Sequence, residues 1–92
     1  MVVNRDIVIK VYQSILEGTL SYASADRWAW NLMQESDKGS LLFEPPDDEG
    51  MLWELIQYLY GIDVPDVDDR NLTARDNTDL IRFLKSKGID LS

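Results

Sequence analysis

The sequence predicts an all-α fold, a compact single domain of about four helices spanning residues 1–92. Apolar residues recur at three- and four-residue spacing in four segments, as on one face of a helix. Helix-starting residues precede these segments, and a glycine follows each of the four. A chain of 92 residues, 45% of them hydrophobic, is also large enough to form one core without disulfides.

The first helix is expected after Asn4 or Asp6, both of which suit an N-cap. Its inward face contains Val8, Val11, Tyr12 and Ile15. The alternation of Ile7, Ile9 and the valine at 11 is also typical of a strand. Helix is favoured because the helical spacing continues as far as Gly18, a suitable terminator.

A second helix is predicted from Ser21 to about residues 38–40. Asp26 lies in its first turns, where an acid complements the helix dipole. Trp28 and Trp30 are about 200° apart on such a helix, so both indoles cannot face one narrow core. The inward stripe consists of Ala25, Trp28, Ala29 and Leu32, with Met33 at its edge.

Between the second and third helices lies the short extended segment 41–46, Leu-Leu-Phe-Glu-Pro-Pro. Its two prolines prevent helix continuation and favour extended backbone. The apolar part is either a short strand or a hydrophobic clip over the bundle, and we favour the clip. Asp47 or Asp48 then caps a third helix.

That third helix has the cleanest amphipathic pattern in the chain, with Trp53 and Tyr60 flanking the stripe and Gly61 ending it. Its inward residues are Met51, Leu52, Leu55, Ile56 and Leu59. A polar loop follows over residues 62–76, with one helical turn expected near 70–73.

The last helix is expected after Asn77 or Thr78. Its apolar residues are Leu80, Ile81, Phe83 and Leu84. Lys85 and Lys87 suit the negative end of the helix dipole, and Gly88 ends the helix.

Charge is concentrated in one part of the chain. Eleven of the seventeen acidic residues lie between Glu35 and Asp69, opposed there by the single base Lys38, and the net charge is −8. A field of one sign selects partners of the other sign, so we expect a basic protein surface as partner and no nucleic acid.

The absence of cysteine and histidine excludes several kinds of chemistry. Zinc, copper and haem sites depend on thiolate or imidazole, as do Ser-His-Asp and Cys-His nucleophiles. We therefore expect no cofactor and no enzymatic activity. An enzyme would need bound Mg²⁺ or Ca²⁺. No secretory signal or apolar run of membrane-spanning length is visible, so we expect a cytoplasmic protein with no membrane association.

The acids at 63–69 invite comparison with a calcium loop. With Asp66 at position 1 and Asp68 at position 3, position 5 is Arg70 and position 6 is Asn71, where the loop needs glycine. Position 12 is Asn77, which cannot replace a bidentate glutamate. An EF-hand is therefore rejected. Two interpretations of residues 63–69 remain, a looser ion site and a solvated acidic loop.

The candidate partner-binding residues combine the acids of the middle segment with aromatics that fall off the inward stripes. For the acids, helix capping and solubility compete with recognition. For the aromatics, burial competes with a role as interface anchors. The set is Trp30, Glu44, Asp47, Asp48, Glu49, Trp53, Glu54, Tyr60, Asp66, Asp68 and Asp69.

Residues 24–30 (SADRWAW), 44–46 (EPP) and 58–63 (YLYGID) resemble short bacterial proteins of uncharacterised function, over roughly residues 15–85. That resemblance implies no activity. In size, acidity and helicity the chain is also similar to bacterial immunity proteins that neutralise nuclease toxins, by analogy alone. The first functional hypothesis is a protein-binding module, in its concrete version an immunity-like or antitoxin-like inhibitor that binds a toxin. The alternative is a homo-oligomeric structural or housekeeping subunit, for instance a homodimer, whose acidity serves solubility.

Overall fold

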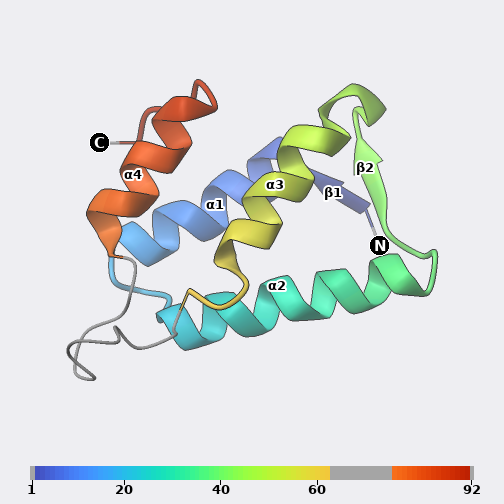
Figure 1. Cartoon of the computed structure of the whole chain (residues 1–92), viewed down its shortest axis with the longest axis horizontal. Coiled ribbons are helices and arrows are strands. Elements are labelled where there is room, and N and C mark those ends of the chain that lie inside the picture. The colour runs from blue at the N-terminus through green and yellow to red at the C-terminus, as the bar shows by residue number, and fades with distance from the viewer. Residues whose placement is uncertain (1, 63–75, 92) are drawn as a thin grey trace.

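The computed structural model describes residues 2–62 and 76–91, which form helices packed beside a two-stranded sheet (Figure 1). The elements in chain order are β1 (Val2–Asn4), α1 (Arg5–Leu16), α2 (Tyr22–Asp37), β2 (Leu42–Glu44), the 3₁₀ turn η1 (Pro46–Asp48), α3 (Glu49–Leu59) and α4 (Asn77–Ser86). The four predicted helices are thus present. The helical turn expected near residues 70–73 lies outside the described residues.

The all-α prediction omitted the small sheet. β1 and β2 pair in parallel, with Val3 opposite Phe43, so residues 41–46 contain a strand and are not only a clip. β1 was not predicted because it is only three residues long and runs directly into α1. Such a short strand carries no periodic signal of its own, and only its pairing with a distant segment makes it recognisable.

Side-chain caps begin three of the helices. Asn4 and Ser21 accept hydrogen bonds from the backbone N–H groups of Ile7 (2.9 Å) and Ser24 (3.1 Å), as predicted for α1 and α2. The cap predicted for α4 was wrong by one residue, because Asp76 forms a capping box with Asp79, at 3.0 Å in each direction.

One hydrophobic core joins β1 to all four α-helices. In Figure 1, α1 and α3 lie between α2 and α4. The core residues are Val3, Val8, Tyr12, Ile15, Ala25, Ala29, Leu32, Leu52, Leu55, Ile56, Leu59, Ile62, Leu80, Leu84 and Ile89. The buried Tyr12 hydroxyl donates to the backbone oxygen of Leu55 at 2.7 Å, which ties α1 to α3 and satisfies the only polar atom of that side chain.

Candidate partner-binding site

Four of the predicted acids lie next to one another in the chain, where β2 leads through η1 into α3. Glu44, Asp47 and Glu49 are exposed and Asp48 is half-buried. None of these four carboxylates forms an ion pair or a side-chain hydrogen bond with another described residue. Their negative charge is therefore directed at solvent.

Helix capping does not account for these acids. Asp48 occupies the N-cap position of α3, as one of the predicted alternatives required, but its side chain accepts no cap hydrogen bond. The reason is that η1 runs directly into α3, so the backbone of Asp48 is already helical (φ −87°, ψ −2°) instead of extended. What remains for these acids locally is a favourable interaction with the helix dipole.

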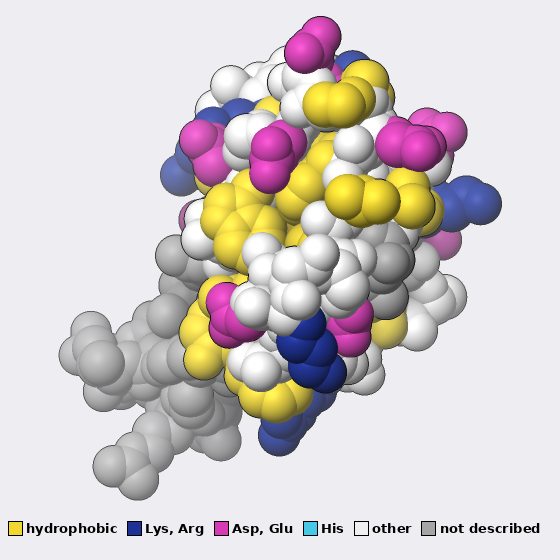
Figure 2. Space-filling model, turned by 90° about the vertical axis from the view of Figure 1, so that its right-hand side faces the viewer, with side chains coloured by type: hydrophobic (Ala, Val, Ile, Leu, Met, Phe, Trp, Pro, Cys, Tyr) yellow, Lys and Arg dark blue, Asp and Glu magenta, His cyan; other side chains and the backbone are white. Residues whose placement is uncertain are grey.

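Apolar side chains accompany the acids at this end of the molecule. Val2 and Leu42 face each other across the sheet and are 43% and 61% exposed. Figure 2 looks onto this end, and hydrophobic side chains spread over its upper half with acidic side chains around and between them. The combination of free carboxylates and exposed aliphatic groups is what a surface for a cationic, partly apolar partner requires.

Trp53 joins this end to the core. Its ring is half-buried and meets Phe43 edge to face, with ring centroids 6.3 Å apart and an interplanar angle of 85°. Phe43 points inward beside the buried Val3. Trp53 is therefore partly a packing residue that supports β2 from behind, while part of its surface stays accessible.

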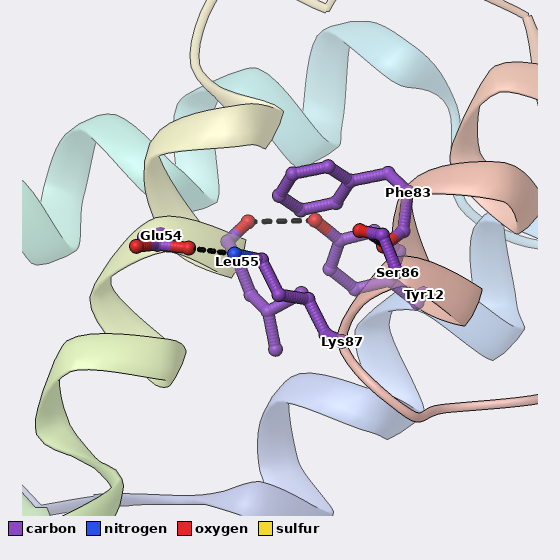
Figure 3. Close-up of polar contacts among 6 residues, drawn as sticks. All are labelled: Tyr12, Glu54, Leu55, Phe83, Ser86 and Lys87. Carbon is purple, nitrogen blue, oxygen red and sulfur yellow. Dashed lines mark hydrogen bonds and ion pairs between the residues drawn. The ribbon is translucent and has the colours of Figure 1, made fainter.

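Glu54 differs from the other acids because it has an ion-pair partner. Its carboxylate forms an ion pair with Lys87 at the end of α4 (Figure 3). The same ammonium lies 5.6 Å from the centroid of the Phe83 ring, and that ring stacks on Tyr58 at 4.0 Å and 13°. Glu54 thus links α3 to the end of α4 through an ion pair at the surface, and Lys87 does more than complement a helix dipole.

Trp30 and Tyr60 are exposed, at 40% and 48%; Trp30 lies in the middle of α2, and Tyr60 lies at the end of α3 that is remote from η1. Tyr60 follows the last residue of α3, about 16 Å along the helix from Glu49. The Asp26 carboxylate accepts a 2.7 Å hydrogen bond from the backbone N–H of Gly61, which has a left-handed φ of +79°. Sequence reasoning assigned Asp26 only to the helix dipole and missed this contact, which no local pattern indicates.

Asp66, Asp68 and Asp69, together with the looser ion site at 63–69, lie outside the described residues. Within residues 2–62 and 76–91, no three carboxylates gather as metal ligands. Glu35, an acid outside the predicted set, accepts a hydrogen bond from the Ser40 hydroxyl at 2.6 Å. This hydrogen bond lowers the pKa of the Glu35 carboxyl, with a smaller contribution from Lys38.

Two hollows in the described surface lie away from the four carboxylates of the β2–η1 end. One, of about 310 Å³, lies between α1 and α2 and is lined by Lys10, Val11, Ser14, Thr19, Leu20 and Trp28. A second, of about 270 Å³, is lined by Tyr58, Asp79, Arg82, Phe83 and Ser86. None of the four carboxylates of the β2–η1 end contributes to either hollow.

No protein-family model matches the chain, and neither curated proteins nor solved structures show a significant match to it. Function must therefore be inferred from the chain's own residues. None of the helices in the described ranges combines the length and the apolarity that crossing a bilayer demands.

Proposed function

We propose that this protein is a non-enzymatic binding module that recognises a basic surface on a partner protein. An immunity-like or antitoxin-like inhibitor of a toxin is the concrete form of the proposal. The supporting observation is that Glu44, Asp47, Asp48 and Glu49 have no described partner and adjoin exposed aliphatic side chains. Unpaired carboxylates speed encounter with a cationic surface, and the adjoining apolar groups hold the complex.

The compartment belongs to the same proposal. A chain without cysteine forms no disulfide and needs no oxidising environment, so we place the protein in the cytoplasm, without cofactor, nucleic acid or membrane. The acid-rich end repels phosphate for the same reason that it attracts ammonium and guanidinium groups.

The first experiment identifies the partner by purification of the tagged protein from its native host. The association rate is then measured against salt concentration for the native chain and for a variant with Asp47, Asp48 and Glu49 replaced by Lys. Because like charges now meet, we expect the rate at low salt to fall about tenfold or more. Unchanged association and unchanged salt dependence would refute the proposal.

A matched single-site control separates local from overall charge. Glu49→Lys and Glu17→Lys change the net charge equally at exposed positions, but Glu17 follows α1 at the far end of the molecule from η1. Only Glu49→Lys should slow association strongly. Equal effects of the two changes would mean that net charge alone drives binding, without a defined site.

One observation favours the second candidate function, a homo-oligomeric structural subunit. Val2 and Leu42 form an exposed apolar pair, which a second copy of the chain would cover in a self-complementary dimer. Sedimentation at low and high salt decides between the two functions. A stable dimer that is insensitive to salt would favour the structural subunit.

A further inference from the structure

β2 is an edge strand. Within the described residues it pairs only with β1, so the backbone groups on its other side have no strand partner. In Figure 1, β2 lies at the margin of the molecule, with no labelled element beyond it. Such an edge is a ready template for pairing with another extended segment.

The surroundings of this edge are chemically distinctive. Leu42 is the most exposed of the large hydrophobic side chains in the described residues, at 61%, and its neighbour across the sheet is the exposed Val2. Glu44 ends the strand, and Asp47 and Glu49 follow it within η1 and α3. An occupant of the edge would therefore meet aliphatic groups at the start of β2 and carboxylates at its end.

We propose that the free edge of β2 binds an extended peptide segment that carries Lys or Arg together with aliphatic residues, by addition of a third strand. The inference rests on the proposed function and specifies how a basic partner is held. Backbone hydrogen bonds to residues 42–44 align the segment, its aliphatic groups cover Leu42, and its cations face Glu44 and the acids of η1.

Charge selects this occupant over a second copy of the chain. Two copies of net charge −8 repel each other, and pairing of two β2 strands would bring two sets of unpaired carboxylates to one interface. A cationic segment removes that repulsion. The edge is three residues long and is followed by Pro45 and Pro46, neither of which has a backbone N–H. Few backbone bonds therefore form, and the side chains must contribute much of the affinity.

The experiment uses the full chain and, as the probe, a capped peptide of the repeat Ser-Val-Ser-Lys, which places Val and Lys on one face of a strand as β2 places Leu42 and Glu44. Binding is measured by titration calorimetry, and amide hydrogen exchange is followed at Leu42, Phe43 and Glu44. A second peptide of the same sequence, methylated at every backbone nitrogen, has the same charge but cannot donate ladder hydrogen bonds. We expect the first peptide to bind and to slow exchange within residues 42–44, and the methylated peptide to bind about tenfold or more weakly.

Equal affinity for the two peptides, or no binding of the first, would overturn strand addition. If both peptides bound equally, but more weakly to Glu49→Lys and not to Glu17→Lys, the proposed function would stand and only strand addition would be rejected. Equal binding of a peptide with Glu in place of each Lys would refute both proposals, because charge would then play no part. Protection of residues 42–44 in a dimer without peptide would also overturn strand addition, because a second copy would occupy the edge.

Discussion

The start and the middle of α3 use acidic residues in opposite ways. Glu54 in the middle of the helix is paired with Lys87, whose ammonium lies against the stacked rings of Phe83 and Tyr58. Glu49 at its start has no described partner and faces solvent beside η1. Acids of the same type, a little over one turn apart, thus join two helices in one case and contribute to an outward field in the other.

This difference teaches that the high acid content is not a uniform solubilising coat. Where α3 meets α4, the fold supplies a base as ion-pair partner; where β2 passes into α3, it supplies aliphatic groups and no ion-pair partner among the described residues. Substitutions in the first region should change stability, and substitutions in the second should change binding with little effect on stability.

The largest difference in stability is expected between two leucines, one in the core and one at the exposed β2–η1 end. Leu55 is completely buried in the core, so Leu55→Ala should lower the free energy of unfolding by about 2–5 kcal/mol in denaturant titrations. Leu42→Ala removes a side chain that is mostly in water and should cost about 0.5 kcal/mol. Similar losses for the two variants would mean that Leu42 is covered in solution.

Helix starts provide the next comparison. Asp76→Ala removes the capping box of α4 and should destabilise the fold by about 1 kcal/mol, measured by thermal or urea unfolding. Asp48→Ala occupies the same formal position in α3 but breaks no cap hydrogen bond, so the expected loss is about 0.3 kcal/mol from the dipole. A larger loss at Asp48 would show that its carboxylate has a structural partner.

A smaller effect is expected at the ion pair. Lys87→Met keeps the aliphatic stem over Phe83 but removes the charge opposite Glu54, and should cost about 0.5 kcal/mol at low salt and less at high salt. A double-mutant cycle with Glu54→Gln measures the coupling. No coupling would return Glu54 to the set of free acids.

The smallest effect appears only at alkaline pH. Burial raises the pKa of Tyr22 above its usual value, with further contributions from the nearby Asp76 and Asp79 carboxylates and from Tyr58. Because the unfolded chain loses this proton first, the contribution to stability is complete below about pH 10 and is lost as pH rises through the folded pKa. Tyr22→Phe should flatten that part of the stability curve. An unchanged curve would assign the loss to other groups.

Much of the helical architecture could be predicted from sequence. The caps at Asn4 and Ser21 and the buried stripe of α3 are local features, and each is visible in a few consecutive residues. The cap of α4 was misplaced because acids and amides stand side by side there, and only the backbone geometry distinguishes Asp76 from Asn77.

The candidate site was predictable in part. Glu44, Asp47 and Glu49 are exposed acids, as their sequence pattern indicates, whereas the ion pair of Glu54 and the packing of Trp53 on Phe43 are not visible in the pattern. Both contacts join residues that are distant in the chain, so composition and spacing carry no signal for them.

By itself the sequence determined approximately where the helices begin and end, which of their faces are apolar and where negative charge accumulates, because each of these properties depends on neighbours within a turn or two. Only the tertiary structure decided that Val2–Asn4 becomes a strand, that Lys87 is opposite Glu54, and that one edge of β2 has no strand partner among the described residues. Those outcomes depend on how the packed helices bring remote segments together, and this is a property of the whole core.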